Sequence, residues 1–462
     1  MDYLNQDELD SGMQALAAAY ASDCELIDLP HTSIEGRTIR ALRIRAKSAN
    51  PSLGIMFTGS VHAREWGGAD ILFYLASDLL AAYAAGKGLL YQVSGKGPGR
   101  TFTASQLAAL RNAVDLFIVP CVNPDGRLYS MTIAPLWRKN RNGSGVDINR
   151  NFDFMWDYKK YFAPSVLNVF SMPSDNPNSD TYRGSGPNSE PETKNVVWLL
   201  DQHPHIRYFV DVHSFTGDVL TAWGDAPNQS TNLSRNFLNP AFDGKRGVDD
   251  LSVYGEYIDT ASVNRSQDLG GCITAAIQDV TGEQYEVHQG YYLAPGSAGG
   301  APGQIYPTAG TSDDYATSRS IQDPQRGQVD GFTIEFHKTS SSDYNFAFHP
   351  PFPKMGEIIA EIDAGLVAFC VCASTPKLPD PSRFGEIYAE VLFGVVQDGG
   401  GVVIINGRPI RIPPWDPLVP QLSGALRVYY DAAALPGAEA RTVMNAALGA
   451  MTKAIATAQS RI

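Results

Sequence analysis

Four short runs of apolar residues stand out along the first three-quarters of the chain. They cover residues 53–57, 114–120, 206–212 and 331–334. Each run is largely continuous rather than alternating, which is typical of strands buried on both faces of a largely parallel sheet. Helical patterns lie between them, at residues 68–85, 105–112 and 189–202. The pattern therefore predicts an α/β fold with a mixed, largely parallel central sheet and helices on both faces.

Polar residues follow each of the four runs at its carboxyl end. The first run leads into Thr-Gly-Ser-Val-His-Ala-Arg-Glu-Trp and the second into Cys-Val-Asn-Pro-Asp-Gly. The third leads into His-Ser and the fourth into Glu-Phe-His. Because ligand sites of α/β sheets collect at the carboxyl ends of the strands, we expect the functional site there.

Two regions are less regular. Residues 217–303 are rich in Gly, Asn, Asp and Ser, and we interpret them as elaborated loops or an insertion around the site. A Pro-Lys-Leu-Pro-Asp-Pro linker then separates a first domain, residues 1–375, from a small C-terminal extension, residues 376–462. In the extension, β-branched runs flank an Asn-Gly pair and predict a hairpin over 401–412.

Charge and composition narrow the classes of function. The formal net charge of −13 argues against a nucleic-acid partner, which requires a basic surface. The longest apolar stretch, residues 71–91, is interrupted by Asp78 and Lys87, so we expect a soluble helix and no membrane partner. The first residues contain no basic and apolar segments of a signal peptide, which favours a cytoplasmic location.

The cysteines suggest no disulfide framework. There are five, an odd and small number, and they form no Cys-x-x-Cys pair. We therefore expect buried free thiols at all five positions, which are Cys24, Cys121, Cys272, Cys370 and Cys372.

A metal site is indicated by His62 and Glu65, which lie three residues apart just after a predicted strand. On a helical turn such residues share a face, so both could bind one ion. His213, at the end of another strand, is the natural third ligand. Two histidines, one carboxylate and a free fourth position make up the ligand set of a hydrolytic zinc site. The remaining histidines lack comparable neighbours; His203 and His205, for example, flank a proline.

Seven motifs, in order, give the chain a resemblance to the digestive-type (A/B) zinc metallocarboxypeptidases. They are His-Ala-Arg-Glu-Trp at 62–66, Trp-Arg-Lys-Asn-Arg at 137–141, Gly-Val-Asp-Ile-Asn-Arg-Asn-Phe at 145–152, Tyr-Arg-Gly-Ser-Gly-Pro-Asn-Ser-Glu-Pro-Glu at 182–192, Val-Asp-Val-His-Ser at 210–214, Ile-Tyr-Pro-Thr-Ala-Gly-Thr-Ser-Asp-Asp-Tyr at 305–315, and Phe-Thr-Ile-Glu at 332–335. The resemblance covers the first domain.

The resemblance implies one Zn²⁺ ion, with His62, Glu65 and His213 as its ligands. It places Asp147 on the carboxylate that orients the first ligand histidine. Glu335 matches the general base that takes a proton from the attacking water.

The same resemblance assigns groups to the substrate, a peptide with a free C-terminus. Arg138 matches the residue that stabilises the oxyanion together with the metal. Asn149 and Arg150 match the pair that binds the terminal carboxylate, for which a forked guanidinium is well suited. Arg64 matches a further contact to a substrate carbonyl or carboxylate, and Tyr306 matches the tyrosine that closes over the C-terminal residue.

The expected specificity follows from Asp313, the residue that falls at the floor of the side-chain pocket in this family. A buried carboxylate is costly unless it is paired, and a Lys or Arg side chain supplies the partner. The sequence thus resembles the B-type members and predicts a preference for basic C-terminal residues. Ligands of mixed charge, such as diaminopimelate in cell-wall peptides, would also suit an acidic floor.

Two other functions stay open at this point. One is a zinc amidase that trims peptidoglycan stem peptides, and the other is an inactive module that binds C-termini. A serine or cysteine hydrolase is disfavoured, because the chain has no Gly-x-Ser-x-Gly motif and no cysteine near the candidate site. No segment resembles the family's inhibitory prodomain, so activation by cleavage is not expected.

Overall fold

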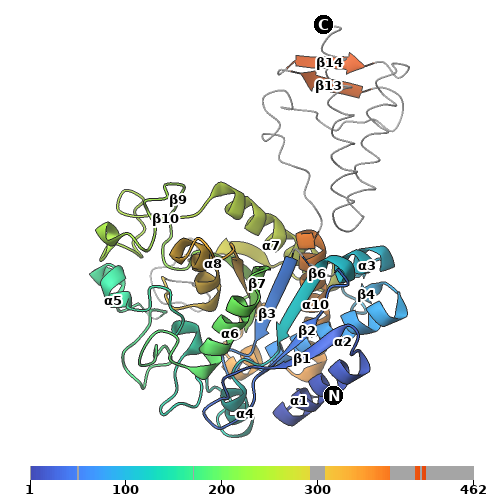
Figure 1. The fold of residues 1–462 in the computed structure, drawn as a ribbon, viewed down its shortest axis with the longest axis horizontal. Helices are drawn as coiled ribbons and strands as arrows, with labels where there is room; N and C mark the ends of the chain where they lie inside the picture. The colour runs from blue at the N-terminus through green and yellow to red at the C-terminus, as the bar shows by residue number, and fades with distance from the viewer. Residues whose placement is uncertain are drawn as a thin grey trace.

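The structure is a computed structural model that describes residues 2–48, 51, 53–169, 171–291, 307–374, 401–405 and 408–412. Its centre is an eight-stranded sheet (Figure 1) with the order β1-β2-β6-β3-β7-β12-β8-β11. The strands are β1 (Cys24–Asp28), β2 (Arg40–Ile44), β3 (Leu53–Gly59), β6 (Val114–Val119), β7 (Ile206–Ser214), β8 (Asp218–Thr221), β11 (Glu286–Gln289) and β12 (Asp330–Phe336).

The middle of this sheet is parallel. β6, β3, β7 and β12 run in one direction side by side. β2 and β8 flank them in antiparallel pairing, β1 pairs antiparallel with β2, and β11 pairs parallel with β8. The four parallel strands are the four apolar runs of the sequence, so the predicted mixed, largely parallel sheet is confirmed. Their continuous hydrophobicity follows from burial on both faces.

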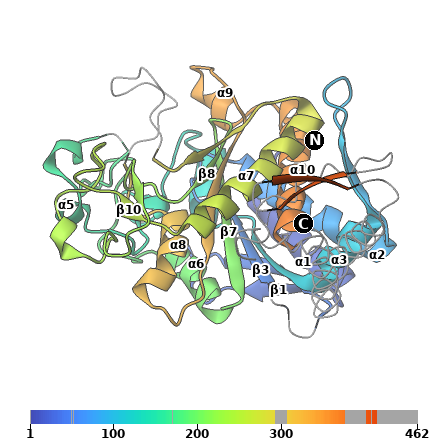
Figure 2. The ribbon, with the colours of Figure 1, turned by 90° about the horizontal axis from the view of Figure 1, so that it is seen from above.

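Two hydrophobic clusters cover the two faces. Side chains of β3 alternate between them, because successive residues of a strand point to opposite faces. Ile55 and Phe57 join one cluster, and Met56 joins the other. Figure 2 shows α6 and α8 on the opposite side of β3 and β7 from α2 and α3. The helices of the first cluster are α1 (Gln6–Ala19), α2 (Gly67–Ala85), α3 (Ala104–Ala113), α7 (Thr260–Thr281) and α10 (Phe352–Ser374), and those of the second are α6 (Pro191–Gln202) and α8 (Ser312–Gln322).

Shorter elements complete the described chain. β4 and β5 form an antiparallel pair, and β9 and β10 form a parallel pair. Their bounds, with those of the short helices, are β4 (Leu89–Tyr91), β5 (Arg100–Phe102), β9 (Gln229–Ser230), β10 (Glu256–Tyr257), α4 (Pro124–Thr132), η1 (Ile148–Arg150), α5 (Tyr158–Tyr161), η2 (Pro164–Val166), η3 (Pro240–Phe242) and α9 (Tyr344–Phe348).

The helix α2 follows the first metal motif and is a core helix. By length and composition it is the one helix in the described part of the chain that could cross a membrane. However, many of its apolar residues, among them Leu72, Leu75 and Leu79, are fully buried in the first cluster. Its apolar character is therefore accounted for by packing against the sheet. Gly86, in the left-handed conformation, ends the helix.

The interpretation of residues 217–303 as elaborated loops or an insertion was wrong for part of their described residues. β8 and β11 belong to the main sheet, and α7 is a helix of 22 residues between them. The buried residues Leu269, Ile273, Ile277 and Val280 recur at helical spacing, and Asp259 caps the helix by accepting from Ser262 N. The many polar residues of the exposed face obscured this period in the sequence. Only the segment between β8 and α7 is built mainly of loops.

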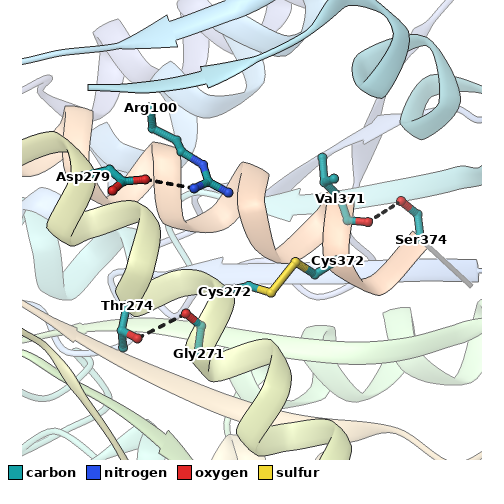
Figure 3. The surroundings of a disulfide bond; sticks show 8 residues. All are labelled: Arg100, Gly271, Cys272, Thr274, Asp279, Val371, Cys372 and Ser374. Carbon is teal, nitrogen blue, oxygen red and sulfur yellow. Dashed lines mark hydrogen bonds and ion pairs between the residues drawn. A yellow bond between two sulfur atoms is a disulfide. The ribbon is translucent and has the colours of Figure 1, made fainter. Parts of the chain in front are cut away.

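The expectation of five free thiols was also wrong. Cys272 of α7 and Cys372 of α10 form a disulfide (Figure 3), with Cα atoms 6.8 Å apart and a separation of 100 residues. Cys24, Cys121 and Cys370 are buried free thiols as predicted. The pairing depends on α7 and α10 lying side by side in the first cluster, which no local pattern shows.

The predicted hairpin of the C-terminal extension is present in the backbone. β13 (Gly401–Ile405) pairs antiparallel with β14 (Arg408–Ile412). The two residues between these strands, and the rest of the extension, lie outside the described residues.

Candidate metal and active site

The three predicted metal ligands converge at the carboxyl ends of two neighbouring parallel strands. His62 and Glu65 lie in the loop between β3 and α2, and His213 lies near the end of β7. Glu65 Oε1 is 2.8 Å from His62 Nδ1, and Glu65 Oε2 is 2.9 Å from His213 Nδ1. The two Nδ1 atoms are 3.0 Å apart. Among the described residues, these three form the one group of His, Cys, Asp and Glu whose ligand atoms all lie within 4.8 Å of one another.

The outer nitrogen of each imidazole faces a buried carboxylate. His62 Nε2 is 3.3 Å from Asp147 Oδ1, and His213 Nε2 is 2.9 Å from Asp211 Oδ2. An adjacent carboxylate favours the proton on Nε2 and leaves the lone pair on Nδ1. Two nitrogen lone pairs and a carboxylate then face one point. These groups repel one another unless a cation lies between them. The donor set and its spacing fit a zinc ion bound about 2 Å from each ligand atom.

Asp147 connects the metal ligands to the substrate groups. Arg138 Nε donates to its Oδ2 at 3.0 Å, and Asn149 N donates to its Oδ1 at 3.1 Å. Burial alone would raise the pKa of Asp147, but Arg138 and His62 lower it far below the ordinary value. The carboxyl therefore stays ionised and holds the guanidinium of Arg138 beside the metal ligands.

Glu335 lies opposite His213 in the register of β12 and β7. It lines the same cavity as His62 and Glu65 and is neither fully exposed nor fully buried. In the metal-free protein its enclosure, and next the charge of Glu65, raise its pKa to about 8. A carboxyl in this position can hold and release a proton near neutral pH, as a general base must.

A cavity of about 180 Å³ contains these groups. His62, Glu65 and Glu335 line it together with charged side chains of both signs. The lining residues are His62, Glu65, Arg138, Asn149, Arg150, Ser214, Thr216, Leu220, Gly224, Gly290, Thr308, Thr311, Asp313, Asp314, Thr333, Glu335 and Phe348.

The predicted carboxylate-binding pair, Asn149 and Arg150, lies in η1 and lines this cavity. Arg150 Nε donates to Ser171 O at 3.0 Å, and Asn149 Oδ1 accepts from Ser312 N at 2.9 Å. Gly310 has a φ of +71°, and a Cβ there would lie 2.5 Å from Arg150 O, so only glycine allows this close approach. Burial lowers the pKa of Arg150 to about 10, which leaves it charged at neutral pH.

Two carboxyl groups line the cavity from the first turn of α8. Asp313 Oδ2 accepts from Thr333 Oγ1 at 3.0 Å, and Asp314 Oδ2 accepts from Gly224 N at 3.0 Å. Burial, followed by the charge of Asp313, raises the pKa of Asp314 well above its ordinary value. The cavity is thus lined by two acidic residues of α8 as well as by the guanidinium of Arg150.

One predicted substrate residue, Arg64, stands apart from this cavity. Arg64 does not line it, but stacks on Phe348, with its Cζ 4.5 Å from the ring centre, and lies 3.5 Å from Asp180. Tyr306 lies outside the described residues, so its predicted closing role remains a prediction.

Sequence reasoning missed Asp211 and Ser312. Asp211 and His213 are two residues apart in β7, so their side chains share a face of the strand. That spacing was visible in Val-Asp-Val-His and could have indicated the contact. Ser312 gives no such signal, because its partner Asp211 is 101 residues away.

The fold is an α/β sheet, and two histidines and one glutamate meet at its carboxyl edge. These features are typical of hydrolases that bind a single metal ion. Within that class, a family model described as zinc carboxypeptidase matches residues 9–362. The chain therefore belongs to the zinc carboxypeptidase family, whose members use one catalytic zinc ion.

Curated relatives are distant. Carboxypeptidase B of Astacus astacus is 25% identical over 347 residues, which is 73% of this chain and 88% of that protein. Metallocarboxypeptidase A of Trichophyton tonsurans is 32% identical over 230 residues, 47% of each protein. Inactive metallocarboxypeptidase ECM14 of Arthroderma otae is 29% identical over 240 residues. The aligned part covers 48% of this chain and 35% of that relative, so this chain spans only about a third of the relative's length.

Solved structures share the fold. Bovine thrombin-activatable fibrinolysis inhibitor, in complex with a tick carboxypeptidase inhibitor, has a TM-score of 0.55 at 18% identity, covering 80% of this chain and 96% of that one. Carboxypeptidase A of Helicoverpa armigera has a TM-score of 0.53 at 21% identity, covering 80% and 74%.

Proposed function

We propose that this chain is an active zinc carboxypeptidase that removes the C-terminal residue of peptides and prefers a basic one. The observation that carries the proposal is a cavity lined by His62 and Glu65 of the three-residue metal group, by Glu335 with its raised pKa, and by Arg138 and Arg150. A relative in this family is named inactive, so family membership alone does not establish activity.

The chemistry divides among the residues of the cavity. A zinc ion held by His62, Glu65 and His213 would polarise the scissile carbonyl and acidify a water molecule. Glu335 takes the proton of the attacking water and passes it to the leaving amine. Arg138, held by Asp147, lies where charge develops on the carbonyl oxygen.

Exopeptidase rather than endopeptidase action is supported by Asn149 and Arg150. A forked, charged guanidinium binds a free carboxylate in two places, and an internal peptide bond offers no such group. Both side chains line the cavity together with His62 and Glu65. A substrate anchored there would present its last peptide bond to the metal.

Preference for basic residues rests on Asp313, which lines the same small cavity beside Asp314. An incoming Lys or Arg side chain would pair with this carboxylate, whereas a Phe or Glu side chain would leave it without a countercharge. One relative of this chain, from Astacus astacus, is named carboxypeptidase B.

Matched N-acyl dipeptides ending in Arg, Lys, Phe or Glu test the proposal, with and without a zinc chelator. We expect chelator-sensitive release of Arg and Lys, reduced about 100-fold or more in Glu335→Gln. Asp313→Asn should lower kcat/KM for Arg far more than for Phe, whereas Asp323→Asn, at the other end of α8, should change neither.

Other outcomes separate the alternatives. Release of Phe in preference to Arg would keep the enzyme and refute the role of Asp313. Release only from peptidoglycan stem peptides would favour the amidase function. Zinc-loaded protein that releases nothing, but binds peptides with a free C-terminus, would identify an inactive binding module.

A further inference from the structure

Ser312, the first residue of α8, contacts both halves of the site. Its Oγ donates to Asp211 Oδ2 at 2.6 Å, and its backbone N–H donates to Asn149 Oδ1 at 2.9 Å. It is 1% exposed, so neither bond competes with bulk water.

On the metal side, the bond of Ser312 fixes the carboxylate behind His213. Asp211 Oδ2 accepts from Ser312 and lies 2.9 Å from His213 Nε2, while Oδ1 accepts from Thr58 Oγ1 at 2.8 Å. The two hydroxyls, one on each oxygen, set the plane of the carboxylate. That plane determines the direction in which Asp211 holds the ring of His213.

On the substrate side, Asn149 continues the path. The side-chain oxygen of Asn149 accepts from Ser312 N, so the amide NH₂ of Asn149 is turned away from that bond. The backbone N–H of Asn149 donates to Asp147 Oδ1. The same oxygen of Asp147 lies 3.3 Å from His62 Nε2. One path of contacts therefore runs between the outer nitrogens of both ligand histidines and passes through Asn149 and Ser312.

We propose that Ser312 is a positioning residue that aligns the metal ligand His213 through Asp211, while its backbone separately orients Asn149 for the substrate carboxylate. The inference rests on the proposed metal site. Partners of metal-ligating histidines typically contribute 10- to 100-fold to metal affinity, and Ser312 acts one bond further out. We therefore expect loss of its hydroxyl to weaken zinc binding about tenfold.

The two roles of Ser312 predict a split in the kinetics. Ser312→Ala removes the hydroxyl but keeps the backbone N–H that holds Asn149. The kcat should fall with the altered metal site, while the KM of a peptide with a free carboxylate should stay close to that of the wild type. A residue with a purely structural role in α8 would give no such split.

Metal binding supplies a readout other than activity. The test measures zinc affinity by competition with a chromophoric chelator, and the visible absorption of the Co²⁺-substituted protein, in the wild type, Ser312→Ala and Ser318→Ala. Ser318 is a matched control, because its hydroxyl is also buried in α8 but donates to a backbone carbonyl, Tyr315 O. We expect weaker zinc binding and a changed Co²⁺ spectrum in Ser312→Ala alone.

Asp211→Asn completes a double-variant cycle. If Ser312 acts through Asp211, Ser312→Ala should weaken zinc binding in the wild type but add little in Asp211→Asn. Equal zinc affinity and spectra in wild type and Ser312→Ala, or equal losses in Ser312→Ala and Ser318→Ala, would overturn the proposal. Wild-type protein that binds no zinc would instead refute the metal site on which it rests.

Discussion

The Nε2 atom of His213 lies 2.9 Å from the Oδ2 atom of Asp211, two residues earlier on the same strand. Both side chains are buried, at 1% and 0% exposure. His62 has an equivalent partner in Asp147, at 3.3 Å. Each ligand histidine is therefore turned toward the metal position by a carboxylate, one provided by a loop and one by the strand itself.

Replacing Asp211 by Asn should weaken zinc binding about 10- to 100-fold. The amide can donate to Nε2, which would place the histidine proton on Nδ1, where the metal must bind. Competition with a chromophoric chelator measures the effect, and circular dichroism of the metal-free protein checks the fold. Asp153→Asn, at an exposed carboxyl outside the cavity lining, is the control. Unchanged affinity in Asp211→Asn would show that its contact with His213 does not orient the ring.

Zinc affinity should decrease as the pH falls. Burial alone would lower the pKa of His213, but Asp211 and Glu65 raise it well above the ordinary value in the metal-free protein. The metal-free imidazole therefore keeps its second proton to higher pH than an ordinary histidine does, and zinc must displace that proton. For each proton that zinc displaces, the apparent zinc affinity falls by up to about tenfold for every unit by which the pH is lowered. Chelator competition between about pH 6 and about pH 8 measures this slope, and a flat profile would contradict the proton competition.

The metal-free Glu335→Gln variant should become increasingly more stable than the metal-free wild type as the pH rises. The unfolded carboxyl ionises near 4.5, but the folded one keeps its proton up to about 8, chiefly because of its enclosure. Between these values the unfolded state has lost a proton that the folded state retains, so rising pH destabilises the wild type. The difference grows by at most about 1.4 kcal/mol per pH unit, less where water enters the cavity.

Urea unfolding of both proteins from about pH 5 to about pH 8 measures this difference. Other titrating groups are common to the two proteins and cancel. A difference that stayed constant over this range would show that Glu335 ionises normally.

The disulfide between Cys272 and Cys372 should stabilise the domain. A cross-link across a loop of this length is worth about 2–5 kcal/mol of unfolding free energy. Adding reductant, or replacing both cysteines by Ser, should lower the melting temperature, whereas Cys24→Ser removes a thiol without removing a cross-link. Equal melting temperatures with and without reductant would contradict the prediction.

The same disulfide bears on location. Disulfides persist mainly in oxidising compartments, so we propose such a compartment in place of the cytoplasmic location expected from the first residues. Mass spectrometry of the protein alkylated at the moment of extraction from its source distinguishes the two. A linked peptide pair supports an oxidising compartment, and two alkylated cysteines support the cytoplasm.

The sequence by itself determined the parallel centre of the sheet and the metal motif. The strands β3, β6, β7 and β12 are buried on both faces, so each reads as a continuous apolar run. His62 and Glu65 are close in the chain, and His213 lies at the end of another strand, so their positions together indicated three ligands of one ion. The motif order added Glu335 and the arginines by resemblance.

Only the tertiary structure decided the contacts between distant segments. The sequence did not predict α7, because the many polar residues of its exposed face obscure the narrow row of buried apolar residues. Its disulfide to α10 could not be predicted, because it depends on the two helices lying side by side. Ser312 contacts Asp211 across 101 residues, and Arg64 stacks on Phe348 instead of lining the cavity itself. Local patterns record which residues are buried or adjacent, whereas the pairing of remote side chains depends on how the layers pack.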